Sequence, residues 1–144
     1  MISVKQLLSK KGHDVWSISP QAPVFDALML MAEKDIGALM VLEEDNLVGI
    51  ISERDYARKV ILKGKSSMET QVKEIMSSEV ISIQPDQTIE NCMELMTNHR
   101  IRHLPVYDGN RLTGVISIGD VVKAIITQQE FLIDQMEQYI TGRR

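Results

Sequence analysis

The chain is poor in cysteine, in long apolar runs and in net positive charge, and each scarcity excludes a class of protein. Its one cysteine, Cys92, excludes an internal disulfide and a zinc site built from thiolates, and it fits a reducing cytosol. No apolar run approaches the roughly 18 residues that a membrane-spanning helix needs, and no signal peptide is evident after Met1. We therefore expect a cytoplasmic protein.

The charge and composition are those of an ordinary globular domain. A net charge of −4 argues against a general nucleic-acid binder, because such proteins are usually basic. The 144 residues are 44% hydrophobic and 25% charged, which is enough apolar material for one compact domain with a real core.

The most informative feature present is an internal repeat. Residues 15–60 align without a gap with residues 80–125, and a direct count finds 14 identical pairs in these 46 positions. A repeat of fixed period determines architecture. It predicts two half-domains related by an approximate two-fold axis, with clefts between them where a ligand would bind.

Each copy has the pattern strand–helix–strand–strand–helix. Apolar residues spaced i, i+3, i+4 and i+7 predict helices beginning at Val24 and at Ile89. We expect strands at 38–42, 47–51, 104–107 and 112–118, with polar hairpin turns at 43–46 and 108–111. Second helices are expected to begin at Tyr56 and Val121. Short helical turns are expected at 4–8 and 72–76, and a linker at 64–71. The domain boundaries predicted from this pattern are 1–66 for the first motif, 67–126 for the second and 127–144 for a helical extension.

The apolar stripe of the last helix continues to Ile140, so another surface must cover it. Packing within the chain and a homodimer contact both account for it. A helix lying on a membrane accounts for it less well, because Glu130, Asp134 and Glu137 make the polar face acidic.

Two Ser-x-x-Asp motifs, 52–55 and 117–120, follow an apolar strand and open a helix. This pattern is typical of a capping box, which is a structural role. It also suits a ligand, because a helix N-terminus with free amides attracts phosphate and a nearby carboxylate accepts the hydroxyls of a ribose. Gly49 and Gly114 precede the serines by three residues, where a missing side chain would let a base approach the strand.

The doubled Gly-x-x-Ser-x-x-Asp, together with the segments 36–41 and 101–106, closely resembles the cystathionine-β-synthase-type (CBS) domain over about residues 3–126. The resemblance implies an α/β (α+β) fold in which two β-α-β-β-α motifs pack with pseudo-two-fold symmetry into one CBS pair, with no catalytic domain attached. Similar pairs usually bind adenine nucleotides in two clefts and often dimerise through helices.

The resemblance also implies which residues form the clefts, each cleft combining the start of one copy with the Ser-x-x-Asp of the other. The first cleft would use Ser17, Ile18, Pro20, Gly37, Ala38, Leu39, Ile116, Ser117 and Asp120. The second would use Ser82, Ile83, Pro85, Arg102, His103, Leu104, Ile51, Ser52, Arg54 and Asp55. The aspartates are assigned to the ribose hydroxyls, the serines to ribose or phosphate, the backbone near Ala38 and His103 to the adenine edge, and the isoleucines to its faces.

The two clefts differ in the size of their residues. Gly37 and Ala38 leave room for a base, whereas Arg102 and His103 occupy the equivalent positions and supply cationic donors for a phosphate. We therefore rank the Asp120 cleft first for adenine. Alternatively, Arg102 and His103 are ordinary surface residues on a strand edge.

Other candidates have simpler explanations. His13 and His99 are expected to be solvated, since no second metal ligand lies at a useful spacing, and Cys92 is expected to be a buried packing thiol. The methionines at 31, 93 and 96 are expected in the core. A basic cluster after the first motif is either a solvated helix face or a contact for an outer phosphate: Arg54, Arg58, Lys59, Lys63 and Lys65.

The leading interpretation is a regulatory module that senses adenine nucleotides, with AMP preferred and ADP, ATP or NAD as alternatives, for a regulated partner protein. S-adenosylmethionine fits less well, because its sulfonium is cationic. The alternative is a ligand-free scaffold for protein–protein interaction. An enzyme has little support: residues 114–119 have the glycine spacing of a P-loop, but Asp120 stands where that loop needs lysine.

Overall fold

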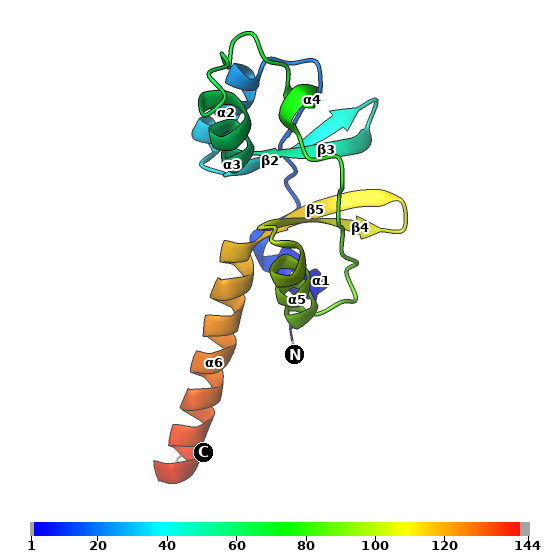
Figure 1. Ribbon diagram of the computed structural model, residues 1–144. Helices are drawn as coiled ribbons and strands as arrows, with labels where there is room; N and C mark the ends of the chain where they lie inside the picture. Colours follow the sequence, from blue (N-terminus) through cyan, green and yellow to red (C-terminus); the bar gives the residue numbers. More distant parts are fainter. Residues whose placement is uncertain (1, 142–144) are drawn as a thin grey trace. The chain divides into compact units, whose positions relative to one another are not determined.

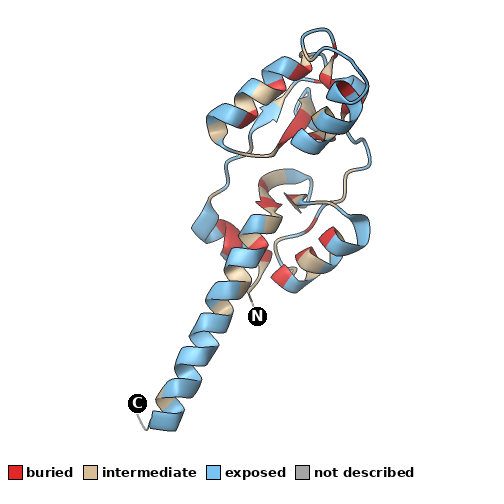
Figure 2. Ribbon diagram, turned by 60° about the vertical axis from the view of Figure 1, so that its left-hand side comes forward, coloured by how far each residue is buried: buried red, intermediate tan, exposed pale blue. Residues whose placement is uncertain are grey.

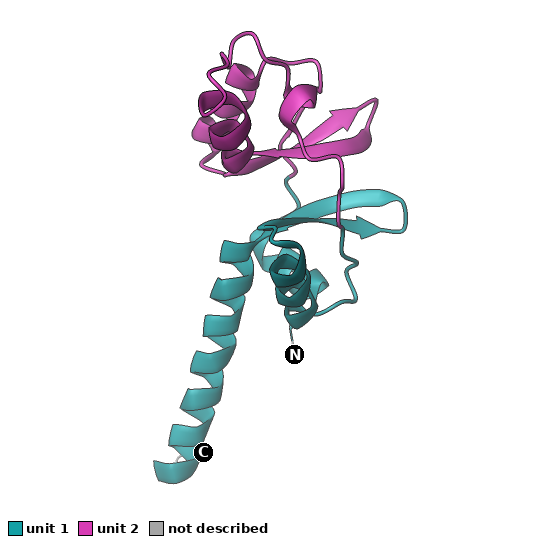
Figure 3. Ribbon diagram, viewed as in Figure 1, with its two compact units in different colours: residues 1–14, 82–144 teal, residues 15–81 magenta. Residues whose placement is uncertain are grey.

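The protein divides into two compact units in the computed structural model, which describes residues 2–141 (Figures 1 and 3). Unit 2 consists of residues 15–81. Unit 1 consists of the chain before residue 15 and the chain from Ser82 onward. The compact units therefore do not coincide with the motifs 1–66 and 67–126 predicted from the repeat.

Unit 2 contains a three-stranded sheet with helices around it. Its elements are β1 (Ser17–Ile18), α2 (Val24–Lys34), β2 (Ala38–Glu43), β3 (Asn46–Ser52), α3 (Glu53–Tyr56), the π-helical turn η1 (Ala57–Ile61) and α4 (Val72–Ile75). The strand order is β1-β2-β3, with β1 parallel and β3 antiparallel to the central β2.

Unit 1 repeats this plan with a shorter sheet. Its elements are α1 (Val4–Lys11), α5 (Ile89–His99), β4 (His103–Asp108), β5 (Arg111–Ser117) and α6 (Ile118–Thr141). β4 and β5 form an antiparallel hairpin. The strand expected near 80–85 is reduced to one parallel bridge between Ile83 and Val106, at the place that β1 takes in unit 2.

The predicted strand and helix order is confirmed, with one systematic error at the second helices. They begin at Glu53 and Ile118, three residues before the predicted Tyr56 and Val121. Ser52 is both the last residue of β3 and the N-cap of α3, and the three residues that follow each motif serine form the first helical turn, as the motif pattern indicates.

The core is made by the apolar positions that the periodicity selected (Figure 2). Val24, Ala27 and Met31 of α2 are buried against the sheet of unit 2. Ile89, Cys92 and Met96 are buried at the equivalent places of α5, while Met93 is half-buried. Cys92 is confirmed as a packing thiol, and burial raises its pKa to about 11. Fully burying one such side chain stabilises the fold by about 1.5–3 kcal/mol.

Two glycines leave room on the hairpins for the short helices, each of which packs on the hairpin of the other sequence motif. A Cβ atom on Gly114 of β5 would lie 2.8 Å from Leu8 Cδ2 of α1, and one on Gly49 of β3 would lie 2.9 Å from the carbonyl oxygen of Ser77, just after α4. Each hairpin therefore has a hollow that admits a short helix or the residues after it. As a result, the helix that precedes the first motif packs on the hairpin of the second.

The last helix continues past the second motif, as its apolar stripe predicts, because α6 is unbroken from Ile118 to Thr141. Residues 142–144 of the extension 127–144 lie outside the described part of the chain. Beyond Ile126 nearly all of the residues of α6 are exposed (Figure 2). Within residues 2–141, no helix combines the length and apolarity needed to cross a membrane.

Candidate functional site

Both Ser-x-x-Asp motifs form the predicted capping box. In unit 1 the Ser117 amide donates to Asp120 Oδ2 at 2.8 Å, and the Asp120 amide donates to Ser117 Oγ at 3.1 Å. In unit 2 the Ser52 amide donates to Asp55 Oδ2 at 2.9 Å, and the Asp55 amide donates to Ser52 Oγ at 3.2 Å. Each motif therefore has a structural role, whatever else it does.

The first backbone amide of each of these helices donates a hydrogen bond to the residue just before a strand. The Glu53 amide donates to the Gly37 carbonyl at 3.0 Å, and the Ile118 amide donates to the Arg102 carbonyl at 2.8 Å. Since the third amide of each helix is taken by serine, two of the first three donors have partners within the chain. This corrects the expectation of free helix amides for a phosphate, and the adjacent carboxylate further disfavours an anion there.

A lysine pairs with each motif aspartate, and the two lysines come from different elements. Lys11 Nζ, at the end of α1, lies 2.5 Å from Asp120 Oδ2 and also donates to the Val115 carbonyl. Lys59 Nζ lies 3.1 Å from Asp55 Oδ1 and donates to the Ile75 carbonyl at 2.8 Å. Sequence reasoning missed Lys11, because a partner 109 residues away leaves no local signal.

Asp120 is the more available of the two carboxylates. Among the described residues, Asp120 Oδ1 has no hydrogen-bond or ion-pair partner, whereas Asp55 Oδ2 accepts from Ser52 and Asp55 Oδ1 is ion-paired with Lys59. The Asp120 side chain is 24% exposed and that of Asp55 is 17% exposed. Burial raises the pKa of Asp120, but hydrogen bonds from Lys11 and Ser117 outweigh this and hold it below the ordinary value. Asp120 is thus ionised and has one open acceptor for a hydroxyl.

Sheet register brings several of the predicted residues together within each unit. In unit 1, His103 lies opposite Ser117 and Leu104 opposite Ile116. The equivalent pairs in unit 2 are Ala38 with Ser52 and Leu39 with Ile51. Ser17 and Ile18 pair with Met40 and Val41 on the other side of β2. The assignment of residues from both copies to one pocket stays a prediction.

His103 does not have the cationic role that was expected of it. Burial lowers its pKa most, and Lys11 lowers it further, while Asp120 acts in the opposite direction with a smaller effect. Since the pKa falls below 6.5, the imidazole is neutral at pH 7. The expected cationic pair is reduced to Arg102, whose side chain is exposed.

The two motif glycines are not openings for a base within the units. The Cβ positions of Gly49 and Gly114 are filled by the segments that pack on the hairpins, Met76–Ser77 and Leu8 respectively. This corrects the expectation of a close ligand approach at these residues, because neighbouring protein groups occupy the space.

The remaining candidates agree with their simpler explanations. His99 is exposed, and His13 is exposed with its Nδ1 2.8 Å from the Thr113 carbonyl oxygen. Among residues 2–141, no group of histidine, cysteine and acidic side chains is arranged to hold a metal. The basic cluster after the first motif is exposed throughout: Arg54, Arg58, Lys59, Lys63 and Lys65.

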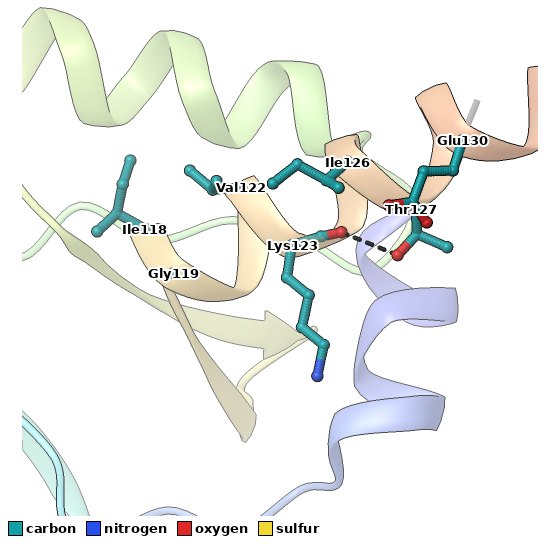
Figure 4. A pocket seen from close by; sticks show the side chains of 7 residues that line it. All are labelled: Ile118, Gly119, Val122, Lys123, Ile126, Thr127 and Glu130. Carbon is teal, nitrogen blue, oxygen red and sulfur yellow. Dashed lines mark hydrogen bonds between the residues drawn. The ribbon is translucent and has the colours of Figure 1, made fainter. Parts of the chain in front are cut away.

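A cavity of about 610 Å³ lies between α1 and α6 and includes Asp120 in its lining. Three lysines, Lys10, Lys11 and Lys123, line it together with polar and apolar side chains of both helices. A second hollow runs along α6, where Ile118, Val122 and Ile126 point to one side of the helix and Lys123 points away from them (Figure 4). Helix α6 therefore has an apolar side and a side that carries a lysine.

Comparisons with known proteins identify the family and the fold. The CBS domain family matches residues 4–62 and 72–127. The mitochondrial CBS domain-containing protein CBSX3 of Arabidopsis thaliana is 39% identical over 139 residues, which are 93% of this chain and 67% of that relative. A solved protein with CBS domains from Burkholderia ambifaria is 49% identical, with a TM-score of 0.85 over 88% of this chain and 96% of that one. The CBS domain pair of protein MJ0100, solved with 5′-methylthioadenosine and S-adenosyl-L-methionine, has a TM-score of 0.79 over 89% of this chain and 98% of its own, but its 23% identity shows the fold alone.

Proposed function

The chain belongs to the CBS domain family, and from this membership we propose that it is a regulatory module that binds an adenine nucleotide. Occupancy of the site favours one conformation of the chain, and a partner protein that binds this conformation reads the signal. The proposal includes a cytoplasmic location and no catalytic activity. It keeps 1–66 and 67–126 as the two sequence motifs and 127–144 as the extension.

The observation that carries the proposal is that Asp120 is ionised and has an oxygen without a partner among the described residues. An ionised carboxylate with one unpartnered oxygen lies beside Ser117 at the end of a hairpin, where Ile116 is buried on the neighbouring strand position. Such a carboxylate accepts the hydroxyl of a ribose through a charge-assisted hydrogen bond.

AMP is the ligand we propose first, with ADP, ATP and NAD as alternatives. The nearby Lys11 favours an anionic ligand over the cationic sulfonium of S-adenosylmethionine. The adenosine-containing ligands in the MJ0100 pair support the ligand class, although that pair shares only the fold with this chain. We place the ligand at Asp120 before Asp55, because Asp55 has partners on both oxygens.

Isothermal titration calorimetry with AMP, ATP and NAD tests the proposal, using Asp120→Ala and Asp55→Ala as a matched pair. We expect micromolar binding of one nucleotide to the wild type. Asp120→Ala should weaken it by about 1–3 kcal/mol, the range for losing a charged hydrogen-bond partner. Asp55→Ala should have the smaller effect. If no nucleotide produces heat, the ligand-free scaffold becomes the better explanation.

We also propose that the module forms a homodimer through α6. Eight apolar residues of α6 are arranged symmetrically about Gln129: Ile126 and Leu132 lie three positions away, Ile125 and Ile133 four, Val122 and Met136 seven, and Ile118 and Ile140 eleven. At 100° per residue all of them lie within about 60° of Gln129 around the helix. A pattern that reads alike in both directions suits two antiparallel copies related by a two-fold axis through Gln129.

Light scattering of the purified chain tests the dimer. Ile133 is 55% exposed, so Ile133→Glu leaves the core intact while placing a charge in the proposed interface. We expect this variant to be a monomer at concentrations where the wild type is a dimer. Gln135→Glu adds the same charge outside the apolar stripe and should remain a dimer. A monomeric wild type, or dissociation by both variants, would contradict this interface.

A further inference from the structure

The cavity between α1 and α6 concentrates positive charge beside Asp120. Its lining contains Lys10, Lys11 and Lys123, and Asp120 is the one acidic residue among the lining side chains. Lys123 points away from the apolar side of α6 (Figure 4), and no hydrogen bond of its ammonium within residues 2–141 holds it elsewhere. Three cations against one carboxylate give the cavity a surplus of positive charge that suits an anion.

An anion in this cavity finds most of the adjacent helix terminus already engaged. The first and third amides of α6 donate to Arg102 and Ser117, and the Asp120 carboxylate lies at the same place. Lys10, Lys11 and Lys123 are the cationic side chains that line the cavity together with this carboxylate, so they are the donors best placed for a phosphate there.

We propose that Lys11, with Lys10 and Lys123, forms a phosphate subsite that makes the Asp120 site selective for nucleotides over nucleosides. This inference rests on the proposed nucleotide function and names the residues that select the ligand class. In the unliganded chain Lys11 occupies Asp120 Oδ2. When the two hydroxyls of a ribose bind the open Oδ1 and Oδ2 of Asp120, Lys11 Nζ exchanges its contact with Oδ2 for the phosphate of the same ligand. Lys10 and Lys123 then meet the outer phosphates of a longer ligand.

The exchange predicts opposite effects of one substitution on two ligands. In Lys11→Met the competitor of the ribose is lost, so adenosine should bind severalfold more tightly. The phosphate partner is lost as well, so AMP and ATP should bind at least tenfold more weakly, as expected for a lost hydrogen bond between charged groups. A purely structural lysine, which only caps the Val115 carbonyl, predicts equal weakening of all three ligands.

Calorimetry of the full chain with adenosine, AMP, ATP and inorganic tripolyphosphate tests the subsite. Lys5→Met is the matched control, because Lys5 is exposed on the same helix and is not part of the cavity. We expect Lys5→Met to bind every ligand as the wild type does. Parallel changes for adenosine and AMP in Lys11→Met would overturn the proposal.

Two further arms separate this inference from the proposed function. If no adenosine compound binds the wild type, the proposed nucleotide function is wrong. Tripolyphosphate binding that depends on Lys11 would in that case still support an anion subsite, and the absence of tripolyphosphate binding would refute the subsite as well. If Lys11→Met does not fold, Lys123→Met takes its place, since Lys123 makes no side-chain bond that the fold needs. That variant should weaken ATP severalfold and leave AMP within twofold, and equal effects on both would count against the subsite.

Discussion

The two motif glycines offer a matched test of how the short helices are held on the hairpins. In Gly49→Ala the new Cβ would lie 2.9 Å from the Ser77 carbonyl oxygen and 2.7 Å from Met76 Sδ. In Gly114→Ala it would lie 2.8 and 3.1 Å from the two terminal methyl groups of Leu8. The overlaps are similar in size but differ in what must move.

The groups around Gly49 are the less able to give way. Ser77 is backbone-bonded to Ile50 in both directions, at 2.9 and 3.0 Å, so moving its carbonyl weakens two hydrogen bonds. Overpacking costs about 1–3 kcal/mol, and each weakened hydrogen bond adds up to about 1 kcal/mol. Around Gly114 only the methyl groups of Leu8 must shift, which breaks no hydrogen bond, and the loss of glycine entropy in the unfolded chain offsets part of that cost. We expect Gly49→Ala to destabilise by about 2–3 kcal/mol and Gly114→Ala by about 1 kcal/mol or less.

Urea unfolding measures both effects, and the single tryptophan helps to assign them. Trp16 lies in unit 2, so its fluorescence follows the unit that contains Gly49, while circular dichroism follows the helices of both units. Gly119→Ala is the control, because its Cβ would meet only Ser117 Oγ at an ordinary 3.6 Å and alanine favours a helix. An equal loss at both glycines, or a larger loss at Gly114, would refute the reasoning.

Three further predictions concern titration and reactivity. The pKa of Asp120 is lowered in the folded chain, so the stabilisation by its carboxylate is complete above the ordinary value of 3.8 and is lost as the pH falls below that value. In urea titrations, the difference in unfolding free energy between the wild type and Asp120→Asn should therefore be large at pH 7 and shrink toward pH 3. The His103 ring should titrate below 6.5 by NMR, and Lys11→Met should move its midpoint upward, because Lys11 is the second cause of the shift. Cys92 is fully buried with a pKa of about 11, so a thiol reagent at pH 8 should modify it only as fast as the chain opens, and rapid modification of the native protein would contradict its burial.

The parts of the fold that could be predicted are those with a local physical cause. The spacing of Val24, Ala27 and Met31 determines a helix face, and Ser52 with Asp55 forms a capping box from atoms three residues apart. Local patterns placed the start of the second helices three residues late, because the apolar spacing that marks these helices begins only at Tyr56 and Val121. The first turns, residues 53–55 and 118–120, carry mostly charged or small residues that do not follow this spacing.

The parts that could not be predicted depend on contacts between distant segments. The sequence shows that Gly49 and Gly114 lack a side chain, but not that Met76 and Leu8 fill the space. The ionisation of His103 was wrongly predicted for the same reason, since its pKa depends on burial and on Lys11, which is 92 positions earlier in the chain. A repeat aligned on itself shows what the two copies share, whereas the lysine beside each motif aspartate differs between them.

That difference bears on function, because the repeated motif and the charges around it have separate origins. The capping box recurs at the same positions in both copies, yet the lysine on each aspartate does not. Lys59 aligns with Ala124 in the second copy, and Lys11 aligns with Glu79 when the short helices are superposed. The cap is thus a property of the repeat, whereas the cation beside each carboxylate belongs to one copy alone. If ligand selection depends on these lysines, exchanging the motif residues Ser52 and Ser117 for threonine should leave the choice of ligand unchanged, while the substitution at Lys11 should alter it.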